Sequence, residues 1–231
     1  MEIRLLGGGA AKDLVNLLSD RFEKITGATI RGEFGPVGGM RDRVRAGEEA
    51  DVLILSRKLM AELVEAGYLD GESITDVGPV ATGVATRSGD TPPVCDTPDA
   101  LRRTLLDADG IFFPDPEKAT AGIHFDEVLR RLGIRDAVDG RLSTHPGGQA
   151  AMQAMAASDC ARPVGCTQVT EILGTQGVSL VAPLPEGYDL TTIYTAGVMT
   201  SSAQQDHARA LIDLITAPET RDLRDRVGFG P

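Results

Sequence analysis

The sequence predicts an α/β protein with two lobes, a ligand cleft between them and a hinge formed by two chain crossings. Three strand-to-helix units follow one another near the start of the chain, as in an open sheet of parallel strands. Two extended segments rich in Gly, Thr and Val, 78–90 and 190–200, indicate the crossings. The first lobe is expected to comprise residues 1–80 plus 196–231, and the second lobe residues 81–195. A chain of 231 residues is long enough for two such lobes.

The first lobe is expected to begin with three strands, each followed by a turn and a helix. The expected strands are 2–6, 28–34 and 51–55, and the expected helices are 12–27, 40–47 and 56–69. The third strand, DVLIL, is almost continuously apolar, which is typical of a strand buried on both faces of a parallel sheet. The first helix should stop at Gly27, and its inward face is expected to consist of Leu14, Leu17, Leu18, Phe22 and Ile25.

The second lobe is expected to contain both helices and strands. The expected helices are 97–108, 121–133, 147–158 and one that opens at Val169, and the expected strands are 110–115, 163–168 and 178–184. A final helix over 202–217 and the tail after it are expected to pack back on the first lobe.

Composition and charge exclude several functions. The formal net charge of −11 disfavours binding to nucleic acid or to an anionic membrane surface. No apolar run approaches the roughly 18 to 20 residues of a membrane span. No signal peptide precedes the first strand, so a cytoplasmic location is expected, or a periplasmic one if a leader has been removed. The three cysteines lack zinc-site spacing and are expected to be free thiols, and no metal or cofactor is expected.

Three glycine-rich turns stand directly before expected helices, so their backbone N–H groups could hold an anion. The alternative for each turn is an ordinary tight connection between strand and helix. The residues expected to face a ligand are Gly9, Ala10 and Ala11 in the first turn, Val37, Gly38 and Gly39 in the second, and Gly147, Gly148 and Gln149 in the third, where the Gln149 side chain could add a donor.

Three polar side chains near the ends of expected strands are further candidates. Ser56 and Arg57 follow the third strand, at the edge of the sheet where ligands bind in open α/β folds. Arg57 could form a fork with a ligand carboxylate, or it could be a solvated helix residue. Arg87 lies just past the first crossing and has the same two interpretations.

The second lobe adds candidates at the starts of two expected helices. Thr120 could cap its helix or contact a carboxylate. His124 lies beside the apolar stripe of the same helix, so it could face the cleft or be a partly exposed histidine without a role. Because imidazole titrates near neutral pH, His124 is the proton-transfer candidate if the protein is an enzyme. Gln168 follows a strand and could contact the ligand, whereas Thr170 is expected to be an N-cap.

Several stretches resemble the type 2 periplasmic-binding-protein fold in its molybdate-binding branch. They are FEKITGATI (22–30), GEEADVLILSRKLMAELVEAGYL (47–69) and the closing segment 194–229. The resemblance spans essentially the whole chain and implies two lobes that close on an anion, with the Tyr194 hydroxyl as a ligand contact. The alternative for Tyr194 is core packing. In that branch the first two turns each present a serine hydroxyl to the oxyanion. Here both turns lack hydroxyls, which disfavours molybdate.

Other stretches are similar to a sub-branch that includes aconitate isomerase, namely 115–134, 146–148 and 165–173. This similarity implies an organic polyacid as ligand. The expected function is binding of a small anion, an organic di- or tricarboxylate, without chemical change. One alternative is an isomerase that shifts a double bond in a tricarboxylate, with His124 moving the proton. A second is binding of molybdate or a related oxyanion for ABC transport, and a permease partner is expected only if the protein is exported.

Overall fold

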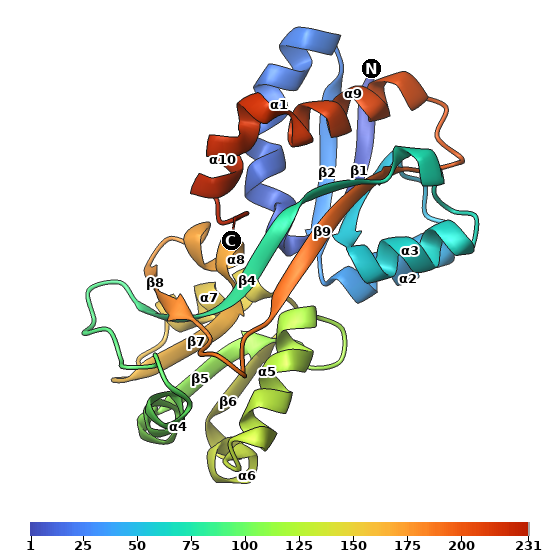
Figure 1. Cartoon of the computed structure of the whole chain (residues 1–231). Coiled ribbons are helices and arrows are strands. Elements are labelled where there is room, and N and C mark those ends of the chain that lie inside the picture. The colour runs from blue at the N-terminus through green and yellow to red at the C-terminus, as the bar shows by residue number, and fades with distance from the viewer. Residues whose placement is uncertain (231) are drawn as a thin grey trace. The chain divides into compact units, whose positions relative to one another are not determined.

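The fold consists of two compact units, and the computed structural model describes residues 1–230 of the chain. Unit 1 comprises Met1–Val80 together with the chain from Thr192 onward, and unit 2 comprises Ala81–Thr191. The course of the chain through both units can be followed by colour in Figure 1. Within residues 1–230, no helix has both the length and the apolar character needed to cross a membrane.

Unit 1 contains a sheet in the order β2-β1-β3-β9, in which β9 is antiparallel and the other strands are parallel. Its strands are β1 (Glu2–Gly8), β2 (Thr29–Gly35), β3 (Val52–Ser56) and β9 (Thr191–Val198). Gly8 lies opposite Gly35, and Gly7 lies opposite Ile54, so the parallel strands end at the same edge. Only the last residue of β3 is not buried, which confirms the prediction for DVLIL.

The helices of unit 1 follow the three parallel strands and close the chain. They are η1 (Gly9–Ala11), α1 (Lys12–Thr26), α2 (Val37–Arg45), α3 (Arg57–Glu65), η2 (Gly71–Ser73), α9 (Gln205–Thr216), η4 (Pro218–Thr220) and α10 (Arg221–Arg226). Figure 1 shows α1 beside α9, and α2 beside α3. The tail helices therefore belong to the unit that begins the chain, as predicted.

Helix α1 buries a narrower face than the sequence predicts. Gly27, with a φ of 72°, ends the helix in the left-handed conformation, which confirms the predicted stop. Leu14, Val15, Leu18 and Phe22 are buried, whereas two expected core residues, Leu17 and Ile25, are 58% and 64% exposed. The first turn of the buried face contributes two residues, and each later turn contributes one. Leu17 and Ile25 lie outside this face, so their side chains face solvent.

Unit 2 contains a sheet in the order β8-β4-β7-β5-β6. Its strands are β4 (Thr75–Arg87), which starts in unit 1, β5 (Gly110–Pro114), β6 (Leu142–His145), β7 (Pro163–Gln168) and β8 (Val178–Pro183). β5, β6 and β7 are mutually parallel, and β4 runs antiparallel to both β7 and β8. The short strand β6 was not predicted.

The helices of unit 2 cover two apolar clusters. They are α4 (Pro98–Asp107), α5 (Thr120–Arg131), α6 (Arg135–Val138), η3 (Asp139–Arg141), α7 (Gly148–Ala156) and α8 (Val169–Leu173). One cluster includes Val164 and Cys166 of β7 together with α4 and α5 residues, and the other includes residues of α7 and α8. Ile111 and Phe113 of β5 belong to the first cluster and Phe112 to the second, so alternate residues of β5 serve opposite faces of the sheet.

The second chain crossing lies earlier than the expected boundary between residues 195 and 196. The structure assigns the chain from Thr192 onward to unit 1. The reason is strand pairing, because Tyr194 lies opposite Ser56 and Thr195 lies opposite Leu55 in the ladder between β9 and β3. At the first crossing, unit 1 ends at Val80 and unit 2 begins at Ala81.

Candidate functional site

The carboxyl ends of β1, β2 and β3 bring the expected ligand residues of unit 1 to one edge. Each strand is followed within one or two residues by η1 and α1, by α2, or by α3. Because the strands end together, the starts of these helices lie side by side. The residues that share this edge are Gly9, Ala10, Ala11, Val37, Gly38, Gly39, Ser56 and Arg57.

The start of α2 has the form of an anion-binding turn. Its N-cap is Pro36, and no side chain caps it. The amide of Met40 donates to the carbonyl of Pro36 at 3.0 Å, so the amides of the first turn before it have no acceptor inside the helix. Gly38 and Gly39 are partly exposed, and a Cβ added to Gly39 would meet no atom within 4 Å. Backbone N–H groups and open space thus coincide here.

Apolar groups lie directly beside this turn. A Cβ added to Gly8 would lie 2.7 Å from Val37 Cγ1 and 2.8 Å from Tyr194 Cε1, so the absence of a side chain lets both pack closely. Val37 and Tyr194 are 5% and 3% exposed. The ring of Tyr194 also packs on Phe229, which places it in the core of unit 1.

The first turn offers only backbone groups to a ligand. Ala10 and Ala11 are 3% and 0% exposed, and both belong to the core of unit 1. Their methyl groups point into the protein, and Gly9 has no side chain. Any contact from this turn therefore comes from amide N–H groups.

Arg57 already has a carboxylate partner within unit 1. Its guanidinium forms an ion pair with Asp76, with an Nε to Oδ1 distance of 3.2 Å, and the Thr195 hydroxyl donates to the same oxygen at 2.9 Å. The hydrogen bond from Arg57 holds the pKa of the Asp76 carboxyl below its usual value, with a smaller contribution from Thr195. Ser56 is the N-cap of α3, but its hydroxyl makes no capping hydrogen bond.

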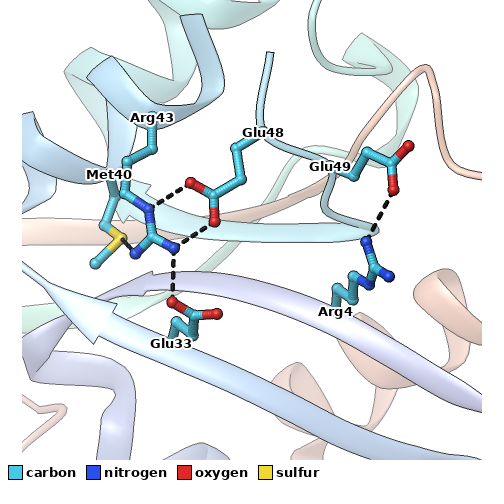
Figure 2. A network of polar contacts seen from close by, with 6 residues as sticks. All are labelled: Arg4, Glu33, Met40, Arg43, Glu48 and Glu49. Carbon is cyan, nitrogen blue, oxygen red and sulfur yellow. Dashed lines mark hydrogen bonds and ion pairs between the residues drawn. The ribbon is translucent and has the colours of Figure 1, made fainter. Parts of the chain in front are cut away.

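A second polar cluster in unit 1 supports α2 (Figure 2). Arg43 Nε donates to Glu48 at 2.6 Å, and its Nη2 donates to Glu33 at 2.6 Å, while Arg4 pairs with Glu49 at 2.8 Å. The hydrogen bond with Glu48 is the main cause that raises the pKa of Arg43. These groups, apart from Arg43, line a hollow of about 360 Å³ that also touches Leu5 and Leu6 in the middle of β1. Since these charges are paired with one another, the cluster ties α2 to β2 and to the loop after α2. The sequence pattern did not indicate it.

The carboxyl ends of β5, β6 and β7 form the corresponding edge of unit 2. Pro114 lies opposite His145, and the three strands are followed by α5, α7 and α8. This arrangement brings together the starts of these helices and the expected ligand residues Thr120, Gly147, Gly148, Gln149 and Gln168.

The start of α5 is packed tightly onto the end of β5. A Cβ added to Gly122 would lie 2.3 Å from the carbonyl oxygens of both Pro114 and Asp115. Thr120 is the first residue of the helix, and the N-cap is Ala119, with no side-chain cap. The prediction of Thr120 as a cap is therefore wrong. Its partly exposed side chain stays at the helix start, where contact with a ligand remains a prediction.

His124 is tied to a loop of unit 2. Its Nε2 lies 2.7 Å from the carbonyl oxygen of Tyr188, and the nearby Arg131 donates to the carbonyl of Gly187 at 2.6 Å. A neutral imidazole in this contact carries its proton on Nε2, which leaves Nδ1 as the acceptor. His124 is the fifth residue of α5, one position beyond the first turn in which the sequence places it.

A carboxyl group that was not predicted occupies the start of α7. Glu171 accepts hydrogen bonds from the backbone N–H groups of Gly148, Gln149 and Gln168, and from the Thr167 hydroxyl at 2.6 Å. A Cβ added to Gly148 would lie 1.9 Å from Glu171 Oε2. Desolvation raises the pKa of the Glu171 carboxyl, and the four donors oppose that rise. The N–H groups expected to hold a ligand at Gly148 and Gln149 thus already have an anionic partner.

Glu171 lies at a spacing that could have been noticed. The N-cap of α8 is Gln168, and Glu171 is the third helix residue, which is the position from which a glutamate reaches back to the N-cap amide. Thr170 lies inside the helix, so its prediction as the N-cap is wrong. The reach of Glu171 to α7 depends on tertiary structure and carries no local signal.

Two buried hydroxyl groups at this edge have no hydrogen-bond partner among residues 1–230. They belong to Thr82, which lies opposite Gln168 in the ladder between β4 and β7, and to Thr170. Thr82 and Thr170 are 1% and 4% exposed, and Gln168 is 3% exposed. A buried hydroxyl normally has a hydrogen-bond partner, so these two groups are donors that a ligand could use.

Arg87 lies away from the other expected ligand residues of unit 2. In the antiparallel ladder Ala85 lies opposite Gly165, so Arg87 lies toward the start of β7, at the opposite edge from Gln168. Its guanidinium donates to the carbonyl of Ser158 at 2.9 Å and pairs with Asp90 at 3.1 Å. Arg87, the last residue of β4, thus lies at the opposite edge of the unit 2 sheet from the other expected ligand residues, and its contact with a ligand stays a prediction.

Metal ligands do not gather anywhere in the described chain. In residues 1–230, no three His, Cys, Asp or Glu side chains are arranged so that they could hold a metal ion. Cys95, Cys160 and Cys166 are free thiols, and burial raises the pKa of the Cys166 thiol.

The chain is similar to known proteins over nearly its whole length. The profile of one family, described as bacterial extracellular solute-binding protein, matches residues 3–230. An aconitate isomerase from a Pseudomonas species is 22% identical over 99% of this chain and 87% of the relative. The molybdate-binding protein ModA of Escherichia coli K12 is 24% identical over 95% of this chain and 86% of the relative.

Two solved structures show the same fold. A periplasmic molybdate-binding protein from Azotobacter vinelandii has a TM-score of 0.82 at 16% identity, covering 99% of each chain. The sulfate-binding protein SubI from Mycobacterium tuberculosis has a TM-score of 0.77 at 17% identity, covering 100% of this chain and 87% of that one. These likenesses confirm the predicted α/β fold class.

Proposed function

Because the chain belongs to the family of bacterial extracellular solute-binding proteins, we propose that it binds a small anion, an organic di- or tricarboxylate, in the interlobe cleft that its sequence predicts. In this proposal the ligand is released unchanged. A permease partner is part of it only if the protein is exported.

The observation that carries the proposal is the start of α2. Uncapped amides at Val37, Gly38 and Gly39 supply donors for negative charge. The buried side chains of Val37 and Tyr194 lie beside them, and no hydroxyl stands in the turn. A carboxylate attached to a carbon skeleton matches both features. Its oxygen atoms can accept hydrogen bonds from the amides, and its carbon atoms can pack against the apolar side chains. A bare tetrahedral oxyanion would use only the amides.

Donors in unit 2 are consistent with a ligand that carries more than one carboxylate. Thr120 at the start of α5 and the unsatisfied hydroxyls of Thr82 and Thr170 are hydroxyl donors at one edge of that unit. A hydrogen bond to a charged group stabilises a complex more than a hydrogen bond between neutral groups does. These hydroxyl donors therefore favour a second carboxylate group on the ligand.

A ligand panel tests the proposal. Thermal melts would be recorded with millimolar molybdate, sulfate, phosphate, succinate, citrate and trans-aconitate, followed by calorimetry on any hit. A ligand at 100 times its Kd stabilises the folded state by about 2.7 kcal/mol, so a di- or tricarboxylate should raise the Tm by several degrees. A melt stabilised only by molybdate would favour oxyanion transport instead, and a flat panel would overturn anion binding altogether.

A matched pair of variants tests where the anion binds. Gly39→Leu fills open space at the start of α2, and Gly140→Leu fills open space in the exposed segment η3. Both should fold, and we expect only Gly39→Leu to weaken binding, by tenfold or more. Equal affinity in the two variants would exclude the start of α2 from the site.

A second candidate function is isomerisation of a tricarboxylate, favoured by the likeness to aconitate isomerase and by the geometry of His124. With Nε2–H held by the Tyr188 carbonyl, Nδ1 is free to take a proton from a carbon next to the substrate double bond and to return it to the far carbon. The double bond then moves by one position, and no oxidant or reductant is needed.

Proton NMR in deuterated buffer tests this second candidate. Purified protein with cis- or trans-aconitate should show conversion with deuterium uptake, and His124→Gln should abolish both. Arg131→Ala is the matched control, because it loosens the same loop and keeps the imidazole. If the wild-type protein does not convert aconitate, isomerisation is excluded. If both variants lose conversion equally, His124 is excluded as the proton-transfer group.

A further inference from the structure

We propose that Glu171 sets the charge selectivity of the anion site, as a fixed negative charge that disfavours ligands with more carboxylates. This inference rests on the proposed function, since it concerns the affinity of that same site.

The position of the carboxylate is the first step. Glu171 Oε2 lies so close to the backbone of Gly148 that an added Cβ there would be 1.9 Å away. The amides of Gly148 and Gln149 both donate to this carboxyl. The charge therefore lies directly on the turn 147–149, which the sequence assigns to ligand binding, and at the same strand edge as Thr120 and Gln168.

The charge balance is the second step. The first turn of a helix carries a positive partial charge of about half a unit, and one carboxylate more than offsets it. Glu171 is held by four donors, three of them backbone N–H groups, and such donors favour the ionised form. The residue as a whole is half-buried, but its carboxyl group is enclosed by these donors, so solvent screens the charge little. The start of α7 is therefore net negative when Glu171 is ionised.

The effect on ligands follows from Coulomb's law. Repulsion between a fixed charge and a ligand grows in proportion to the ligand charge, and for a ligand held at this strand edge of unit 2 we expect it to amount to about tenfold in affinity for each unit of ligand charge. A chain without this charge should bind all anions more tightly and should favour a tricarboxylate over a dicarboxylate about tenfold more than the wild-type protein does.

Calorimetry at pH 8 and fixed ionic strength tests the inference with two saturated ligands, succinate and propane-1,2,3-tricarboxylate. Glu171→Gln removes the charge at nearly constant shape. Thr167→Val removes one donor to the carboxyl but keeps the charge. Asp109→Asn removes a carboxylate that also accepts two backbone N–H bonds, from Ala161 and Arg162, at the start of β5, the opposite edge of the sheet.

We expect the ratio of tricarboxylate to dicarboxylate affinity to rise about tenfold in Glu171→Gln and to stay unchanged in the two controls. An unchanged ratio in folded Glu171→Gln, or an equal rise in either control, would overturn the inference. A wild-type protein that binds neither these ligands nor others of the panel would instead refute the proposed function, and the inference with it.

A measurement on the wild-type protein covers the case in which Glu171→Gln does not fold. The ¹³C shift of the Glu171 carboxyl, assigned through its side-chain correlations, reports ionisation directly. An ionised signal at pH 8 supports the inference, and a protonated one overturns it.

Discussion

The ring of Tyr194 packs edge to face against the ring of Phe229, with 6.1 Å between the ring centroids. The other side of Tyr194 lies against Gly8, at the carboxyl end of β1. Phe229 is held in turn by Gly78, whose added Cβ would lie 3.5 Å from it, and the amide of Gly230 donates to the carbonyl of Pro79. Phe229, together with the backbone of Gly230, therefore supports a ring beside the candidate site.

Phe229→Ala should destabilise unit 1. The side chain is 2% exposed, and removing a buried phenylalanine costs about 3 kcal/mol or more. Urea unfolding followed by circular dichroism measures this loss. Leu17→Ala is the control, because Leu17 is 58% exposed and its removal should change stability by less than about 0.5 kcal/mol. Similar losses in the two variants would mean that Phe229 does not pack as the structure shows.

Gly8→Ala should destabilise the protein by about 1–3 kcal/mol, because the new methyl group would overlap Val37 and Tyr194. Adding Val37→Ala should restore part of the loss, and a double-mutant cycle measures the coupling. Gly39→Ala is the matched control, since its methyl group enters open space in a helix and should leave stability equal or higher. If Val37→Ala restores none of the stability lost by Gly8→Ala, Val37 does not pack against Gly8 as the structure shows.

Gly122→Ala should be among the most damaging single substitutions in unit 2. The added Cβ would approach backbone carbonyl oxygens at 2.3 Å, and backbone atoms cannot move aside as a flexible side chain can. We expect a loss of about 3 kcal/mol and weaker ligand binding, because the start of α5 must shift. Gly140→Ala, in open space, serves as control in the same denaturation experiment. A native melt for Gly122→Ala would show that α5 is not seated on β5.

The ion pair between Arg57 and Asp76 should contribute stability that depends on pH. The pKa of Asp76 is lowered in the folded protein, so the contribution is present above the unfolded value of about 3.8 and is lost as the pH falls through the lowered folded value. Since both side chains are about half exposed, it should not exceed about 1 kcal/mol. Asp76→Asn should therefore be less stable than the wild-type protein at pH 7, and the difference should shrink as the pH falls below about 3.8.

The control for this pH series is Asp20→Asn, at an exposed aspartate of α1. Its stability should follow that of the wild-type protein at every pH. A difference between Asp76→Asn and the wild-type protein that persists at low pH would point to a cause other than the ion pair.

Much of the fold could be predicted because its signals are local. The apolar run of β3 and the glycine that ends α1 each determine their element without distant partners. The alignment of strand ends followed from parallel pairing, which placed most ligand candidates of each unit at one edge.

The details of the candidate site depend on partners that lie far along the chain. Arg57 finds Asp76 nineteen residues away, and Glu171 reaches amides of another helix. Neither contact can be recognised from the residues that neighbour its two partners in the sequence. Helix starts were also missed where the N-cap has no capping side chain, as at Ala119 and Gln168, because the neighbouring threonines gave the stronger local signal.

The insertion of unit 2 within unit 1 has a consequence for synthesis. β9 pairs with β3, and α9 lies beside α1, yet β9 begins only at Thr191, the last residue of the inserted unit, and α9 follows it. As the chain leaves the ribosome from its N-terminus, all strands of the unit 2 sheet emerge before β9 does. Until then the apolar strand β3 has an unpaired edge. The unit that begins the chain is thus the last to be completed.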